Sequence, residues 1–101
     1  MKSPDPDALV PIALAELRRG ESGVVKGLVA AVLGTSSEEY DSMLARLRDL
    51  GFIPGARCEV IARMWFGGDP LAVRIGGSTF ALRRAEAAVV RVTRFVPPAP
   101  A

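Results

Sequence analysis

The residues that could do chemistry are few and do not form a familiar catalytic set. The 101-residue chain has no histidine and one cysteine, Cys58, so no serine or cysteine triad of the usual kind can be built. The local acid group, Glu38, Glu39 and Asp41, falls in the first turn of an expected helix, where the helix dipole favours carboxylates. A transition-metal site needs several converging His, Cys or carboxylate ligands. We therefore expect no catalytic residue, no cofactor and no metal-binding residue, and we read Cys58 as a small core residue.

Phosphate and nucleic-acid chemistry are also poorly supported. Gly76-Gly77-Ser78-Thr79 follows an expected strand, but it leads into no helix and carries no lysine, unlike G-x-x-x-x-G-K-[ST]. The net charge is +2, and the adjacent basic pairs, Arg18-Arg19 and Arg83-Arg84, both have acids close by. Nucleic-acid binding rests on cations gathered on one face. The sequence thus favours a non-enzymatic binding module with no nucleic-acid partner.

One helix is expected to interrupt a series of strands. Valine and leucine interspersed with glycine predict a first strand from Gly23 to about Ala31, bent near Gly27. A capping box, Ser36 with Glu39, begins a helix whose apolar residues fall on one stripe: Tyr40, Met43, Leu44, Leu47 and Leu50. Gly51 and Pro54 then end the helix, because glycine takes the left-handed conformation and proline cannot continue the helix.

Beyond the helix the apolar residues alternate with a period of two, which predicts strands. The expected inward residues are Cys58, Val60, Ala62 and Met64, then Leu71, Val73 and Ile75, and finally Val90 and Val92. Turns are expected at 66–70 and at Gly76-Gly77, and one helical turn at 83–86 should precede a last strand at 87–93. The prediction is a mainly β (α+β) fold, a partly open barrel of five short strands with one helix inserted between the first and second, since closure removes exposed sheet edges.

Composition also bounds the domain and the compartment. We expect flexible, Pro-rich ends at 1–11 and 96–101 and one domain at 12–95. A lone cysteine fits a reducing compartment, and the prolines and aspartates near the N-terminus do not fit a secretory signal. The 11 uncharged residues between Lys26 and Glu38 are too few for a membrane span, which takes about 20. We expect a cytoplasmic protein without membrane insertion.

The order and spacing of several motifs resemble those of the FeoA family. The motifs are LGFIPG at 50–55, Glu59-Val60, GDPLAVRI at 68–75, ALRRAEA at 81–87, and an opening Leu14-x-x-Leu17-x-x-Gly20 followed by Val24-Val25. The resemblance spans residues 12 to 94. It implies an SH3-like barrel that acts without catalysis on the cytosolic part of FeoB, the membrane permease of bacterial ferrous iron uptake. Two stretches depart from the family pattern, 64–66 and 30–37.

Some residues could serve either the fold itself or contact with a partner protein. We expect Phe52 to plug the core and Ile53 to reach the surface. The structural motif comprises Leu50, Gly51, Phe52, Pro54, Gly55, Asp69 and Pro70. Trp65 and Phe66 either face outward as an interface anchor or turn inward at a bulge near Gly67. The candidate partner contacts are Leu47, Ile53, Trp65, Phe66, Arg83 and Arg84.

The resemblance also leaves an alternative open. The same module forms the C-terminal domain of DtxR-type repressors, so the chain could be a metal-responsive or nucleic-acid-associated barrel. The sequence does not decide whether the chain self-associates, whether it binds a transition metal directly, or whether the nucleotide state of a partner controls docking.

Overall fold

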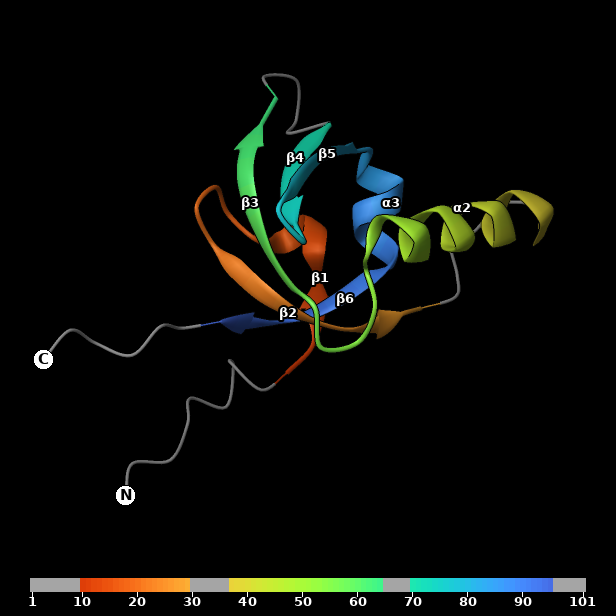
Figure 1. Cartoon of the computed structure of the whole chain (residues 1–101), viewed down its shortest axis with the longest axis horizontal. Helices are drawn as coiled ribbons and strands as arrows, with labels where there is room; N and C mark the ends of the chain where they lie inside the picture. The colour runs from red at the N-terminus through yellow and green to blue at the C-terminus, as the bar shows by residue number, and fades with distance from the viewer. Residues whose placement is uncertain (1–9, 30–36, 65–69, 96–101) are drawn as a thin grey trace, which may run out of the picture.

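Six antiparallel strands form one curved sheet in the computed structural model, which describes residues 10–29, 37–64 and 70–95 (Figure 1). The strand order is β1-β6-β2-β3-β4-β5. The strands are β1 (Ile12–Ala13), β2 (Ser22–Leu28), β3 (Arg57–Arg63), β4 (Leu71–Ile75), β5 (Ser78–Leu82) and β6 (Val90–Phe95). The helices are η1 (Leu14–Glu16), α2 (Ser37–Leu50) and α3 (Arg84–Val89). The predicted mainly β fold, with its long helix between the first long strand and the next, is confirmed.

The described residues contain six strands where five were predicted. The additional strand is β1, which pairs with β6 through Ile12 opposite Val92 and Ala13 opposite Arg91. Two residues are too few to show an alternating pattern, so no sequence period reveals this strand. It makes one edge of the sheet, and β5 makes the other.

Strand β2 bends where the sequence predicts it. Its register against β6 shifts between Val25 and Gly27. It pairs with β6 along most of its length, but it pairs with β3 only from Ser22 to Val24. The later half of β2 therefore has a strand on one side alone within the described part of the chain.

Strand β3 contains a bulge that the alternating pattern does not predict. Its register against β4 shifts between Val60 and Ala62, so an extra residue reverses the alternation beyond that point. The inward orientation predicted for Met64 is wrong: its side chain is 45% exposed. The bulge instead places Arg63 opposite the buried Leu71.

The segment after β5 is more helical than predicted. Helix α3 runs to Val89, so β6 begins at Val90 and not at the predicted Ala87. The backbone N–H of Arg83 donates to Glu86 Oε1 at 2.9 Å, which satisfies a free donor at the start of the helix. Alanine has the highest helix propensity, and RAEAAV has three alanines. Local propensity thus wins over the strand pattern here.

One core fills the barrel, and α2 projects from it (Figure 1). The helix contributes Leu47, which is fully buried, while the rest of its predicted apolar stripe packs partly against the core. The predicted inward residues of β4 and β6 are all buried, and so are Cys58 and Val60 of β3. The predicted cap residue Ser36 lies outside the described residues.

Candidate functional site

The predicted helix stop at Gly51 is confirmed and has a defined geometry. The N–H of Gly51 donates to the carbonyl of Arg48 at 3.0 Å, and the N–H of Phe52 donates to the carbonyl of Leu47 at 3.0 Å. This pair of bonds is the Schellman motif, which satisfies carbonyls that the helix end leaves free. Gly51 has a φ of 110°, a conformation that residues with a Cβ rarely adopt.

A second turn follows at once and fixes the corner to β2. The N–H of Ala56 donates to the carbonyl of Ile53 at 3.0 Å, and Gly55 has a φ of 92°. Proline followed by a glycine of positive φ suits a type II turn. Backbone bonds from Gly55 N–H to Val25 O and from Val25 N–H to Ala56 O, at 2.8 and 2.7 Å, join this turn to β2. The corner is therefore held from both sides.

The two apolar residues of the corner point in different directions. Phe52 is 1% exposed and belongs to the core, as predicted. Ile53, the next residue, is 51% exposed. Two turns fix the backbone around Ile53. A partner that contacts its side chain would therefore not have to order this part of the chain on binding.

Two hollows meet at Gly27 and Leu28 of β2, and the first of them adjoins this corner. One, of about 250 Å³, lies between the corner and the end of α2 and β2, and is lined by Gly27, Leu28, Arg48, Phe52, Ile53 and Pro54. The other, of about 560 Å³, shares Gly27 and Leu28 and adds Pro11, Lys26, Val29 and Arg91. We call the two together the β2 groove. Its lining includes three cations and no carboxylate.

The partner-contact role predicted for Leu47 does not fit the structure. Its side chain is fully buried on the core-facing side of α2, so no partner can reach it in this fold. Trp65, Phe66 and Asp69 lie outside the described residues, so their predicted roles stay predictions. Pro70 is half-buried, at the start of β4.

Arg83 and Arg84 are both exposed, immediately before α3 and at its first residue. Arg83 lines a hollow of about 430 Å³ with Arg46 and Glu86. An ion pair between Arg46 and Glu86 links α2 to α3 across this hollow. Arg84 lines a different hollow, with Ala15, Arg63 and Leu71, and neither of the two predicted arginines lines the β2 groove.

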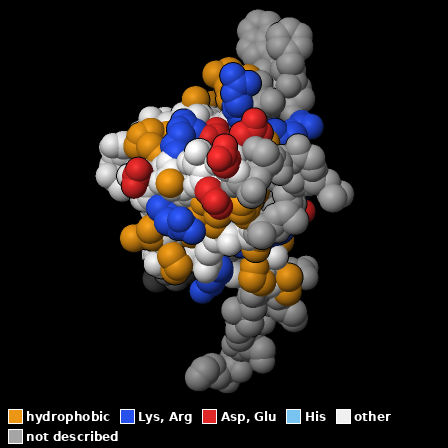
Figure 2. Space-filling view, turned by 90° about the vertical axis from the view of Figure 1, so that its right-hand side faces the viewer, with side chains coloured by type: hydrophobic (Ala, Val, Ile, Leu, Met, Phe, Trp, Pro, Cys, Tyr) orange, Lys and Arg blue, Asp and Glu red, His pale blue; other side chains and the backbone are white. Residues whose placement is uncertain are grey.

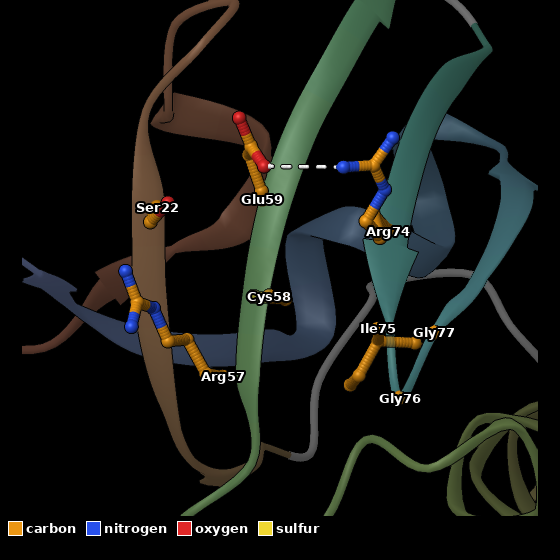
Figure 3. Close-up of a pocket in the computed structure, with 8 residues that line it drawn as sticks. All are labelled: Ser22, Arg57, Cys58, Glu59, Arg74, Ile75, Gly76 and Gly77. Atoms are coloured by element: carbon orange, nitrogen blue, oxygen red, sulfur yellow. Dashed lines mark ion pairs between the residues drawn. The ribbon is translucent and has the colours of Figure 1, made fainter.

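Another hollow, of about 280 Å³, opens over β3 and the β4–β5 turn (Figure 3). The guanidinium groups of Arg57 and Arg74 point in different directions, and Arg74 faces Glu59, with 4.0 Å between the charged atoms. The Arg57 guanidinium carbon lies 3.7 Å from the centre of the Phe95 ring. Each cation has a partner of its own, so the two do not converge on one ligand position.

Cys58 lines the same hollow but is 2% exposed. Burial raises the pKa of its thiol from 9.0 to about 11, and a weak bond to the carbonyl of Gly23, at 3.6 Å, lowers it by less. The thiol is therefore protonated at neutral pH, whereas a nucleophile or metal ligand needs the thiolate. This agrees with the core role predicted for Cys58.

Charges of both signs are mixed on one face of the described residues (Figure 2). Figure 2 shows one face, on which basic and acidic side chains lie among one another with carboxylates gathered near its centre. Within residues 10–29, 37–64 and 70–95, no three His, Cys, Asp or Glu side chains come together in a way that could hold a metal ion. In the same residues, no helix is long and apolar enough to cross a bilayer.

Comparison with known protein families places this chain. The sequence model of the FeoA domain matches residues 12–94, most of the chain. The chain belongs to the FeoA family. Among curated proteins, none matches it.

Solved FeoA structures share the fold. FeoA of Stenotrophomonas maltophilia, solved with zinc, is 36% identical with a TM-score of 0.66; the match covers 80% of this chain and 88% of that one. FeoA of Chlorobium tepidum is 28% identical with a TM-score of 0.68, and the match covers 84% and 71% of the two chains. The first is described as a procaryotic SH3 domain protein, which confirms the predicted SH3-like fold.

A manganese-dependent transcriptional repressor has the same fold at 24% identity, with a TM-score of 0.69. The match covers 91% of the FeoA-family chain and 44% of the repressor. At that identity the likeness concerns the fold alone.

Sequence reasoning found Ile53 but missed most of the β2 groove. The sequence pattern places Leu28 and Arg91 on expected strands, and Arg48 on the expected helix outside its apolar stripe. The signal that could have pointed to them is the predicted bend at Gly27, because a bent strand loses a neighbour. The sequence pattern does not show which strands pair with β2, so it does not show on which side the neighbour is lost.

Proposed function

We propose that this FeoA-family chain is a non-enzymatic accessory component of bacterial ferrous iron uptake that binds the cytosolic part of the FeoB permease. Family membership over residues 12–94 supports the transport role. The S. maltophilia relative, 36% identical, was itself proposed as a ferrous iron transport activating factor. On this proposal the chain acts in the cytoplasm, through residues 12–95 as its domain.

One observation favours binding at the corner that follows α2. Ile53 is half exposed beside a buried Phe52, on a backbone fixed by the Schellman motif and the turn at Pro54-Gly55. An apolar side chain on a rigid surface contributes to binding without the entropy cost of ordering a loop. The corner is thus suited to contact another protein.

Uptake and binding together test the proposal. Deleting the gene should lower the initial rate of ⁵⁵Fe²⁺ uptake by cells, and the wild-type chain supplied in trans should restore it. The purified chain should also retain the cytosolic part of FeoB from the same organism in a pull-down. Equal uptake with and without the gene, together with no retention of FeoB, would refute the proposed function.

The alternative is a metal-responsive or nucleic-acid-associated barrel. It is supported by the shared fold of the repressor, and a fold by itself does not carry function. On the face that Figure 2 shows, charges of both signs are mixed, which favours DNA binding through that face less, since DNA binding needs cations gathered to neutralise several phosphates. Retention of duplex DNA that weakens steeply with salt, or saturable quenching of Trp65 fluorescence by Mn²⁺ or Fe²⁺, would establish it instead.

A further inference from the structure

We propose that the β2 groove docks an extended, acidic segment of a partner protein, with one apolar side chain of that segment against Ile53. The inference deepens the proposed function and rests on it in one respect, the use of the cytosolic part of FeoB as the partner. Four properties of the groove carry the inference: a free strand edge, room for a backbone, clustered apolar side chains and unpaired cations.

The free edge belongs to the later half of β2. Strand β3 pairs with β2 only as far as Val24, and the backbone bonds of Val25 to the turn at Gly55 and Ala56 are the last on that side. Gly27 and Leu28 pair with β6 on their other side. In the described residues no strand lies beside them toward the corner. An unpaired strand edge accepts an extended peptide through main-chain hydrogen bonds.

Gly27 gives a second chain room to approach. A Cβ built at this position would meet no atom within 4 Å, so the face of β2 next to its free edge is open at Gly27. Both hollows of the groove share Gly27 and Leu28. A backbone laid along this stretch could therefore reach from one hollow into the other.

The exposed apolar side chains gather at this groove. The described part of the chain has four large apolar side chains that are strongly exposed, and Ile53 and Val29 line the groove at 51% and 37% exposure. Val10, 55% exposed, precedes the lining residue Pro11, and Met64 lies elsewhere, just after the end of β3. Clustered exposed apolar residues rimmed by polar ones are typical of a protein contact.

Charge identifies the kind of occupant. Lys26, Arg48 and Arg91 line the groove, and none of them takes part in an ion pair found in the described residues. The hydroxyl of Tyr40 donates to the carbonyl of Val29, which brings the acidic first turn of α2 toward that end. Carboxylates of the occupant should thus lie toward Arg48, which lines the other hollow from Val29. Complementary charge raises the rate and the specificity of association.

The test uses the intact chain with two probes. The first is the cytosolic part of FeoB, with the dissociation constant measured by calorimetry. The second is a synthetic peptide of eight residues, glutamates around a central leucine, compared with the same peptide carrying lysines, with binding mapped by backbone-amide NMR shifts. The variants are Ile53→Glu and Arg48→Gln in the groove, with Arg19→Gln as a matched control on an exposed arginine outside it.

The expected results are specific to the groove. Ile53→Glu should weaken FeoB binding by about tenfold or more, because a central apolar contact is lost and a like charge is added. Arg48→Gln should weaken it about threefold and reduce its salt dependence, while Arg19→Gln should change it by less than about twofold. The glutamate peptide should shift the amides of Gly27, Leu28 and Val29, and the lysine peptide should not. Since both altered groove side chains are exposed, circular dichroism should show all variants folded.

The outcomes separate the two proposals. If FeoB binds the wild-type chain but binds Ile53→Glu and Arg48→Gln equally well, the groove inference is wrong and the proposed function stands. If FeoB does not bind at all while the glutamate peptide maps to the groove, the groove inference stands and the proposed partner is wrong. A lysine peptide that binds as well as the glutamate peptide would overturn the inference. So would an Ile53→Glu variant whose one effect, in sedimentation, is loss of a dimer, since the occupant would then be a second copy.

Discussion

Replacing Gly51 with alanine should destabilise the protein through its backbone alone. Gly51 has a φ of 110°, and a Cβ at this position would meet no atom within 4 Å. The cost is therefore that of holding an alanine in a conformation that L-residues avoid, about 1–2 kcal/mol of unfolding free energy. Relaxing the backbone does not avoid this cost, because it breaks the two bonds of the Schellman motif, each worth about 1 kcal/mol.

Urea unfolding followed by far-ultraviolet circular dichroism measures this change. The matched variant is Gly51→Asn, because asparagine tolerates positive φ better than alanine and can end a helix in the same way. We expect the order of stability to be glycine, then asparagine, then alanine. Gly51→Ala should also weaken partner binding further than Gly51→Asn does, since the same turn aims Ile53.

Two outcomes would contradict the strain expected at position 51. If the unfolding free energy of Gly51→Ala lies within about 0.3 kcal/mol of the wild-type value, the positive φ carries no strain and the Schellman motif does not hold the corner. An asparagine variant less stable than the alanine variant would also contradict it.

Three further predictions concern other parts of the fold. Leu47→Ala should lower the unfolding free energy by about 2–5 kcal/mol because Leu47 is fully buried, whereas Ile53→Ala should change it by less than about 0.5 kcal/mol, as urea titration would show. The Cys58 thiol, with its pKa raised from 9.0 to about 11, keeps its proton in the folded state while the unfolded chain loses it, so stability should fall between those pH values by at most about 1.4 kcal/mol per pH unit. Arg63→Met should lower the unfolding free energy by about 1–3 kcal/mol, because its guanidinium donates to two backbone carbonyls at η1, one of them 3.1 Å from Nε.

Each of these has a control. Ile53→Ala serves as the surface control for Leu47→Ala, and equal losses would mean that the helix is not anchored by Leu47. The alkaline loss of stability attributed to Cys58 should be absent from Cys58→Ala, and an unchanged pH profile in that variant would assign the loss to another group. Arg63→Lys should recover part of the loss seen with methionine, since it restores the charge and one donor; no difference between the two would show that the carbonyl contacts do not stabilise the fold.

The corner after α2 could be predicted because its causes are local. A glycine ends the helix, a Pro-Gly pair turns the chain, and a phenylalanine between them has more to gain from burial than from exposure. Those three facts are visible in LGFIPG itself. The structure adds the hydrogen bonds and shows that Ile53 is left outside.

The other parts depended on pairing between distant strands. The register of β3 against β4 shifts between Val60 and Ala62. This bulge reverses the alternation of side chains, and with it the predicted orientation of Met64. The β2 groove exists because β3 leaves β2 after Val24. Neither event changes the local sequence pattern, so neither could be read from it. At α3 the sequence held two competing signals, and the helical one prevailed up to Val89.

The pairing of β1 with β6 brings the entrance and the exit of the domain together. Ile12 lies opposite Val92, so the chain enters the fold beside the strand on which it leaves. A unit whose ends meet can be joined to, or set within, a longer polypeptide without opening its sheet. In the manganese-dependent repressor the same fold occupies under half of the chain. For protein engineering, this geometry makes the domain a compact insert whose attachment points are already side by side.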